Sequence, residues 1–180
     1  MTKANWITIL RILLVPIFLV FILTEMDNKE IFAFIVFLIA SVTDGLDGYI
    51  ARKFNQVSDL GKFLDPIADK LLISAALIAL VSLNEVETWV AAVIIMRELF
   101  ISAFRFYSLM KDASFSASRL AKIKTTFQIV SISIFIIYRK LPFSNTLFII
   151  ATILIYIAVI LSIYSGFIYV TKYSKVIKGS

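Results

Sequence analysis

Residues 44–69 read DGLDGYIARKFNQVSDLGKFLDPIAD, and this stretch decides how the rest of the chain can fold. It places Asp44, Asp47, Asp65 and Asp69 at the facing ends of two apolar segments. Helical spacing would put the first two carboxylates on one face, and the last two on one face of the next helix. Residues 55–58 between them read as a turn. The sequence therefore predicts a helical hairpin on which four carboxylates converge.

The composition around this hairpin is that of an integral membrane protein. Of 180 residues, 61% are hydrophobic and only 17% are charged, and the mean hydropathy is +0.96. Soluble domains are nearer half apolar, with about a quarter of their residues charged. The chain has no Cys and no His, which excludes disulfides, thiolate nucleophiles and imidazole bases. Any chemistry must come from carboxylates, hydroxyls, Lys and Arg.

Six apolar segments are long enough to cross a membrane, a length of about 20 residues. The predicted spans are Trp6–Leu23, Ile31–Lys53, Lys62–Leu83, Thr88–Met110, Ile123–Tyr138 and Thr146–Thr171. The connections are short and leave no soluble domain. We therefore expect an all-α, polytopic membrane protein with six transmembrane helices, formed as one catalytic domain over residues 1–180.

Lys and Arg are distributed unevenly between the two ends of these predicted spans. Most lie in the termini and in the second and fourth connections, whereas the other connections hold only Lys29, Arg139 and Lys140. The positive-inside rule therefore predicts cytoplasmic termini and a cytoplasmic carboxylate site. For Arg139 and Lys140 the sequence suggests nothing beyond headgroup contact. The net charge of +6 suits anionic lipids and phosphate-bearing substrates, but no basic domain is available for nucleic acid.

Four converging carboxylates repel one another unless protons or cations neutralise them. Oxygen ligands favour hard cations, so the pattern predicts Mg²⁺ or Mn²⁺, with one ion or two ions sharing ligands. Gly48 would allow a ligand to approach the backbone, and Arg52 would contact a phosphate. The structural alternative is that the aspartates are interfacial charges paired with Arg52, Lys53 and Lys70.

At these residues the chain resembles the CDP-alcohol phosphotransferase family, whose signature is D-x2-D-G-x2-A-R-x8-G-x3-D-x3-D. Every fixed position is met, by Asp44, Asp47, Gly48, Ala51, Arg52, Gly61, Asp65 and Asp69. The family's six-helix fold agrees with the predicted spans, so the resemblance covers essentially the whole chain. It implies a homodimer in the bacterial cell membrane, with a polar cavity open to the cytoplasm and the inner leaflet.

The resemblance also implies roles for individual residues. Asp44, Asp47 and Asp65 would bind one divalent ion, Asp44, Asp65 and Asp69 would bind a second, and Asp69 would be the general base. The residues that would bind CDP-diacylglycerol are Asn5, Thr8, Arg11, Gly48, Arg52 and Ser58. For the first three, which form an Asn-x2-Thr-x2-Arg pattern, interfacial anchoring and helix capping are the alternative.

The acceptor alcohol is suggested by basic residues later in the chain. The run Arg97-Glu98, Arg105 and Lys122-Ile123-Lys124-Thr125 is similar to that of bacterial phosphatidylglycerophosphate synthases, although Ala121 stands where many have Gly. Arg105, Lys122 and Lys124 would then bind the phosphate of sn-glycerol 3-phosphate. For the two lysines, the alternative is a positive-inside charge. Arg97 and Glu98 lie mid-span, so we expect them to face the interior and pair with polar groups.

The expected reaction is transfer of the phosphatidyl group from CDP-diacylglycerol to sn-glycerol 3-phosphate, with release of CMP. Alternatives within the family differ in the acceptor, and phosphatidylglycerol as acceptor would give a cardiolipin synthase. A membrane prenyltransferase also binds Mg²⁺-diphosphate on Asp-rich helices, but it typically has more spans and two separated Asp motifs. A divalent-cation transporter is the alternative of another class, although the second half of the chain has no matching acidic hairpin.

Overall fold

A computed structural model describes residues 3–54, 59–109 and 119–178, and within them the chain is all-helical. Every predicted segment is a helix, and the α-helices with one short 3₁₀-helix are α1 Lys3–Leu23, α2 Lys29–Phe54, α3 Asp59–Ser82, α4 Thr88–Leu109, α5 Arg119–Ile137, η1 Tyr138–Lys140 and α6 Ser144–Lys178. The predicted and observed ends differ most at α6, which continues seven residues past Thr171 because hydropathy locates the apolar part of a helix and not its last hydrogen bond.

The apolar length of the helices varies along the chain. Among the described residues, Ser144–Tyr169 in α6 is the one helical stretch long and apolar enough by itself to cross a membrane. Thr8–Leu23 and Lys70–Ser82 are shorter apolar stretches. The all-α architecture is therefore confirmed, while the predicted spanning by all six helices is carried forward as a proposal.

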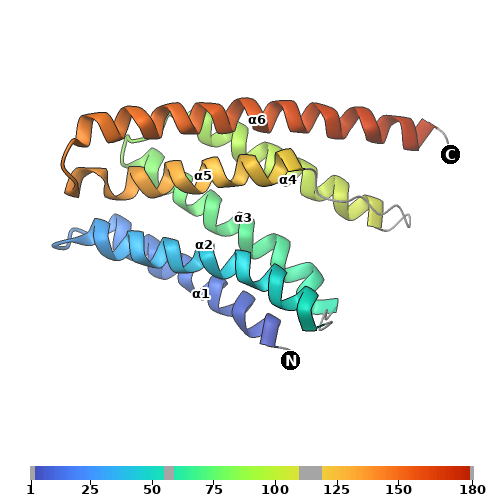
Figure 1. Cartoon of the computed structure of the whole chain (residues 1–180), viewed down its shortest axis with the longest axis horizontal. Coiled ribbons are helices and arrows are strands. Elements are labelled where there is room, and N and C mark those ends of the chain that lie inside the picture. Colours follow the sequence, from blue (N-terminus) through green and yellow to red (C-terminus); the bar gives the residue numbers. More distant parts are fainter. Residues whose placement is uncertain (1–2, 55–58, 110–118, 179–180) are drawn as a thin grey trace.

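The helices alternate in direction along one long axis. In Figure 1, the N-terminal ends of α1 and α3 lie toward the right-hand side, together with the C-terminal ends of α2, α4 and α6. The opposite ends of these helices lie toward the left. We call these the signature end and the far end of the bundle, because the Asp-rich segment of α2 and α3 lies at the former. Short turns at the far end use left-handed backbone at Asn28 and Asn84, a conformation that Asn tolerates better than most residues.

The core is built around α1, which packs on both α2 and α3. Phe18 of α1 and Phe37 of α2 are fully buried, with ring centroids 5.8 Å apart. Small residues such as Ala40 and Ala76 allow the helices to approach closely, and they are also fully buried. Helix α5 packs against α2 and α3 on one side and against α6 on the other, while α4 joins α3 to α6. Helix α5 therefore connects the N-terminal and C-terminal halves.

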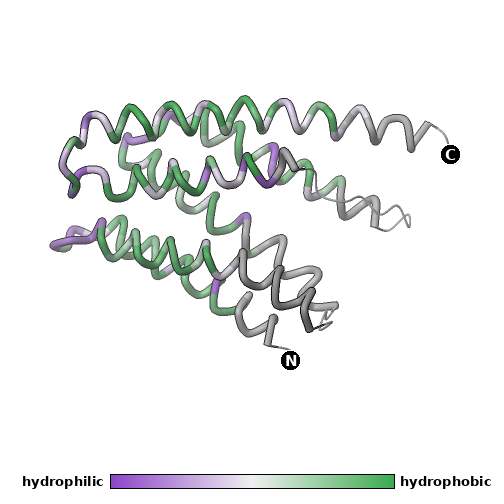
Figure 2. Tube along the Cα trace, in the orientation of Figure 1, coloured by the Kyte–Doolittle hydropathy of each residue, from purple (hydrophilic) through white to green (hydrophobic). Residues whose placement is uncertain are grey.

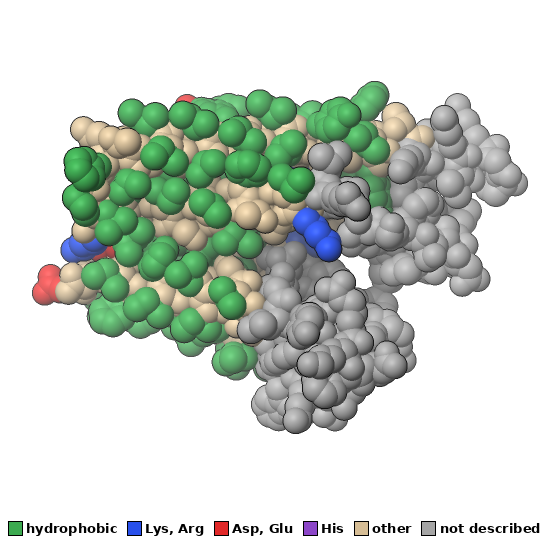
Figure 3. All heavy atoms as spheres, in the orientation of Figure 1, with side chains coloured by type: hydrophobic (Ala, Val, Ile, Leu, Met, Phe, Trp, Pro, Cys, Tyr) green, Lys and Arg blue, Asp and Glu red, His purple; other side chains and the backbone are tan. Residues whose placement is uncertain are grey.

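The outer surface of this bundle is strongly apolar. Large side chains such as Leu13, Val42, Ile78, Met96 and Phe167 are exposed, and Figure 3 shows hydrophobic side chains covering the described part of the visible face. Figure 2 shows the hydrophilic positions concentrated in the far-end turns and at a few points within the helices. An apolar surface of this extent is far larger than the patches that soluble monomers expose.

The far end is held together by a charged network that joins the three far-end turns, which we call the far-end clamp. Arg139 Nη2 lies 2.5 Å from Glu85 Oε1, and Lys140 Nζ lies 3.7 Å from Glu30 Oε2. Tyr138 donates a 2.8 Å hydrogen bond to Glu85 Oε2 and accepts one of 3.0 Å from Arg139 Nε, which raises the pKa of Arg139 above its ordinary value. The sequence suggested only headgroup contact for Arg139 and Lys140, whereas the structure pairs them with carboxylates from other turns.

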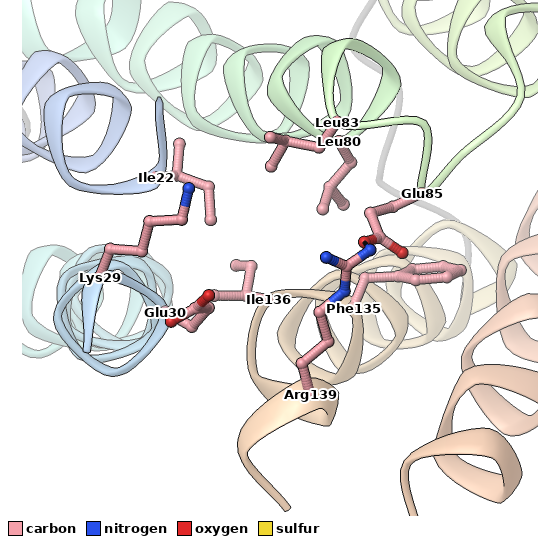
Figure 4. Close-up of a pocket in the computed structure, with 9 residues that line it drawn as sticks. All are labelled: Ile22, Lys29, Glu30, Leu80, Leu83, Glu85, Phe135, Ile136 and Arg139. Carbon is pink, nitrogen blue, oxygen red and sulfur yellow. Dashed lines mark ion pairs between the residues drawn. The ribbon is translucent and has the colours of Figure 1, made fainter. Parts of the chain in front are cut away.

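Figure 4 shows the side chains of this region around a cavity of about 60 Å³. Arg139 and Glu85 meet on one side of it, and Lys29 and Glu30 line the α2 side. The apolar part of its lining consists of Ile22, Leu80, Leu83, Phe135 and Ile136. Glu85 is only 7% exposed, so its charge depends on the Arg139 and Tyr138 contacts.

We predict that Glu85→Gln lowers the stability of the bundle without reaching the signature end. Hydrogen bonds to charged groups contribute about 1.5–3 kcal/mol each, so the midpoint of thermal unfolding in detergent should fall by several degrees. Glu87→Gln is the matched control, because Glu87 is exposed and its side chain contacts Trp89 and Tyr156, outside the far-end clamp. Circular dichroism melting measures both variants, and an equal midpoint for Glu85→Gln and wild type would show that the clamp does not stabilise the fold.

Candidate active site

The two aspartate pairs occupy helical positions, as the signature spacing requires. Asp44 and Asp47 lie in the last three turns of α2, and Asp65 and Asp69 lie in the first three turns of α3. Their side chains lie outside the described residues, and among the described side chains no group of three or more acidic residues could hold a metal. The site is therefore placed by helix register.

The aspartate positions continue the spacing of the buried residues on each helix. On α2 the buried Ala33, Phe37 and Ala40 are spaced by four and three residues, and the same spacing continues to positions 44 and 47. On α3 the buried Leu72, Ile73 and Ala76 share their face with positions 65 and 69 in the same way. Positions 44 and 47 of α2 and positions 65 and 69 of α3 thus continue the spacing of the buried residues of their helices, at the signature end.

Helix α1 brings its own polar residues to this core. Thr8 and Arg11 are fully buried, three residues apart, on the face that continues to the buried Phe18 and Ile22. A buried guanidinium is costly unless it is hydrogen-bonded or paired, so a role as a headgroup anchor at the surface does not fit Arg11. Asn5 lies one turn earlier in α1, and its side chain lies outside the described residues.

The remaining predicted nucleotide-binding residues lie near the α2–α3 connection. Gly48 and Arg52 belong to the last two turns of α2, and their side chains lie outside the described part of the chain. Ser58 itself lies outside the described residues. Helix α3 begins at Asp59, the residue that follows Ser58 in the sequence.

A second polar cluster joins helices α4, α5 and α6, and we call it the Glu98 cluster. Glu98 Oε1 pairs with Lys124 Nζ and, at 3.2 Å, with Arg97 Nη1. Arg97 Nη2 donates a 2.8 Å hydrogen bond to Ser165 Oγ on α6. The Arg97 side chain also passes over Gly166, where an added Cβ would lie 3.6 Å from its Cγ. The expectation that Arg97 and Glu98 face the interior and pair with polar groups is confirmed.

The structure separates two lysines that the sequence had grouped together. Lys124 is only 1% exposed and points to Glu98, whereas Lys122 is an exposed residue. Residues two apart on a helix point in nearly opposite directions, so these two lysines cannot line one pocket side by side. Arg105 lies in the last two turns of α4, at the same end of the bundle, and its side chain lies outside the described residues.

Sequence reasoning missed Ser165 as a member of this cluster. The signal was present in the chain, because Ser162 and Ser165 interrupt the most apolar helix and are both buried. A buried hydroxyl within an apolar segment indicates a polar partner on a neighbouring helix. That partner, Arg97, could not be identified without the packing of α4 on α6.

Comparison with known proteins agrees with this geometry. Residues 1–164 match the CDP-alcohol phosphatidyltransferase family over its characteristic sequence pattern, and this range contains α1 to α5, the signature and most of α6. The chain belongs to the CDP-alcohol phosphatidyltransferase family. The resemblance inferred from the eight signature positions is therefore confirmed.

Individual members of the family are similar along nearly their whole length. The chain is 39% identical to the CDP-diacylglycerol–glycerol-3-phosphate 3-phosphatidyltransferase of Bacillus subtilis (strain 168), covering 98% of this chain and 97% of that one. It is 37% identical to the protein of the same name from Haemophilus influenzae, covering 97% and 92%. It is 34% identical to the probable phosphatidylglycerophosphate synthase of Mycobacterium tuberculosis (strain H37Rv), covering 98% and 83%.

Proposed function

We propose that the protein transfers the phosphatidyl group from CDP-diacylglycerol to sn-glycerol 3-phosphate, giving phosphatidylglycerophosphate and CMP. The observation that carries this proposal is the complete signature, which lies on α2 and α3, with its four aspartates at the spacing of the buried residues of those helices. Full-length similarity to proteins named for this reaction supports the choice of acceptor. Apolar exposed surfaces and the alternating helices support a bundle in which all six helices span the bacterial cell membrane. Membership of the family implies that it works as a homodimer.

The orientation follows from the positions of the basic residues. Most Lys and Arg outside the helix centres lie at the signature end, which we therefore place in the cytoplasm. At the far end, Arg139 and Lys140 are the exception to the charge rule, and both are paired with carboxylates. Paired basic residues weigh less against the rule than free ones. The water-soluble acceptor and CMP would then enter and leave from the cytoplasm while the lipid tails remain in the bilayer.

The donor set fits a divalent ion, because four carboxylates and no His or Cys favour Mg²⁺ or Mn²⁺. Asp44, Asp47 and Asp65 would hold one ion, and Asp44, Asp65 and Asp69 would hold a second. When bound, such ions draw charge from the phosphoryl oxygens and from the leaving group.

The chain's own residues would bind and orient the reactants. The free hydroxyl of sn-glycerol 3-phosphate attacks the β-phosphorus of CDP-diacylglycerol, and the bond to the CMP oxygen breaks. Asp69 would take the proton of that hydroxyl, a task that falls to a carboxylate in a chain without His. Positioning and charge neutralisation would supply most of the rate.

The nucleotide end of the donor has its own set of residues. Asn5, Thr8 and Arg11 on α1, with Gly48, Arg52 and Ser58 around the α2–α3 connection, would hold the CDP moiety. The burial of Thr8 and Arg11 toward the core supports this assignment, because it directs them inward and away from the lipid-facing surface. A planar guanidinium also binds phosphate oxygens through two hydrogen bonds, which suits Arg11 and Arg52.

The acceptor phosphate would be bound by Arg105 and by Lys124, with exposed Lys122 adding positive potential at the same end. CMP release by purified protein with CDP-diacylglycerol and Mg²⁺ tests the whole proposal, comparing sn-glycerol 3-phosphate, phosphatidylglycerol, serine and inositol phosphate. Release only with sn-glycerol 3-phosphate is expected. Release with phosphatidylglycerol instead would make the protein a cardiolipin synthase, and metal uptake into vesicles without any CMP release would make it a transporter.

We predict that Arg105→Ala raises the KM for sn-glycerol 3-phosphate at least about tenfold while changing the KM for CDP-diacylglycerol less than about twofold. The substitution removes a charge-assisted contact with the phosphate of sn-glycerol 3-phosphate, and it removes no contact with CDP-diacylglycerol. Steady-state CMP release at varied acceptor and donor measures both constants. Arg139→Ala at the far end is the matched control and should leave both constants unchanged. Equal increases in the two constants for Arg105→Ala would assign Arg105 a structural role.

A further inference from the structure

We infer that Glu98 is a positioning residue for the acceptor subsite: it holds the Lys124 side chain in place for the acceptor's phosphate. This inference rests on the proposed function, because that proposal makes Lys124 a phosphate ligand. Glu98 itself carries a negative charge and would not bind a phosphate. Its contribution is through the two cations that it contacts, Lys124 and Arg97.

The geometry that carries the inference is the sharing of one carboxylate oxygen. Both Lys124 Nζ and Arg97 Nη1 contact Oε1 of Glu98, so two cations from α5 and α4 meet at a single atom. The exposed fractions of the Lys124 and Arg97 side chains are 2% and 12%, which leaves water little access to screen their repulsion. Without the carboxylate, two like charges would face each other in a buried site.

Two of the three ionisable side chains in the Glu98 cluster are cations. One carboxylate faces two cations, so the three side chains carry a net positive charge even with Glu98 ionised. Glu98 is more open than Lys124, with 18% of its side chain exposed. The contact with Glu98 orders the Lys124 side chain before a phosphate binds. Binding then does not have to supply the entropy cost of fixing a long flexible side chain.

Contacts on either side fix the position of this cluster. Ser165 Oγ accepts a hydrogen bond from Arg97 Nη2, and the Arg97 side chain lies against Gly166. Helix α6 therefore fixes the position of Arg97. Lys124 lies in the second turn of α5, the helix that packs against α2, and α2 carries half of the signature. The cluster thus includes a residue of the helix that packs against the one bearing Asp44 and Asp47.

The experiment compares Glu98→Gln with wild type in CMP release. We expect the KM for sn-glycerol 3-phosphate to rise about tenfold, with the KM for CDP-diacylglycerol changed less than about twofold. Glu85→Gln is the matched control, because it makes the same substitution at another largely buried, ion-paired glutamate, in the far-end clamp. It should lower the melting temperature and leave both KM values unchanged. An unchanged acceptor KM in folded Glu98→Gln would overturn the inference.

A double-mutant cycle with Lys124→Met tests whether Glu98 acts through Lys124. The double variant should bind acceptor no more weakly than Lys124→Met alone, since removing the lysine removes what Glu98 positions. Additive losses would overturn the inference. If Glu98→Gln does not fold, Glu98→Asp replaces it, because the shorter side chain keeps the charge but moves it away from Lys124. An unchanged acceptor KM in Glu98→Asp would also overturn the inference. Wild-type protein that ignores sn-glycerol 3-phosphate would instead overturn the proposed function on which this inference rests.

Discussion

Replacing Asp69 by Asn is expected to lower kcat for CMP release by about 10³-fold or more while leaving the helices folded. The amide has the same shape but cannot accept the proton of the acceptor hydroxyl, and positioned general bases contribute about 10²–10⁴-fold. Asp69 precedes the buried Ile73 and Ala76 of α3 by four and seven residues, which is the spacing of one helical face. Binding of CDP-diacylglycerol should be largely retained, because the base acts on the other substrate.

Asp59→Asn is the matched control for this prediction. It makes the same change on the same helix, at the first residue of α3 and outside the signature positions, so kcat should stay within about twofold. Melting temperature and CDP-diacylglycerol binding by isothermal titration separate loss of chemistry from loss of fold or substrate. Normal turnover by Asp69→Asn would refute its role as base, and loss of donor binding together with turnover would assign it to substrate binding.

The pH dependence of the two proteins adds an independent readout. A carboxylate base must be ionised, so wild-type kcat should rise with pH until Asp69 is deprotonated and then level off. Asp69→Asn has no such group, and its residual rate should lack that ionisation. A residual rate with the wild-type profile would mean that another carboxylate is the base.

The helices could be predicted from the sequence because their signal is local. Six apolar segments and an aspartate spacing of three and four residues are readable without any long-range contact, and the helices α1 to α6 follow them closely. The same register predicted the common face of Asp44 and Asp47. Helix ends were less predictable, since α6 extends past its apolar stretch.

The partners of charged residues could not be predicted in the same way. Arg139 pairs with Glu85 across 54 residues of sequence, and the choice between Lys122 and Lys124 depends on how α5 is rotated against α4. Both pairings depend on how the helices pack, and the positions of charges along the chain do not show how each helix is rotated about its axis. Composition therefore identified the class of chemistry, while the structure indicated which basic residue faces inward.

Removing divalent metal is expected to abolish CMP release completely and reversibly. Four carboxylates at the signature positions leave a large local negative charge, and the diphosphate of the donor adds more. Without a cation, neither charge is neutralised, so incubation with EDTA should reduce activity to background. Adding Mg²⁺ or Mn²⁺ in excess should restore it, because both fit oxygen ligands at short distance.

Calcium provides the discriminating comparison. Ca²⁺ prefers ligand distances of about 2.3–2.6 Å and more ligands, against about 2.0–2.1 Å for Mg²⁺, so it should occupy the site and restore little activity. Electron paramagnetic resonance of Mn²⁺ measures occupancy independently of turnover, and Asp47→Asn should weaken that binding while Asp59→Asn should not. Full activity after EDTA, or equal Mn²⁺ binding by Asp47→Asn and wild type, would show that the signature aspartates serve as structural charges. In that case the pairing of the aspartates with Arg52, Lys53 and Lys70 would be the better account of their helical spacing, and the catalytic proposal would lose its metal.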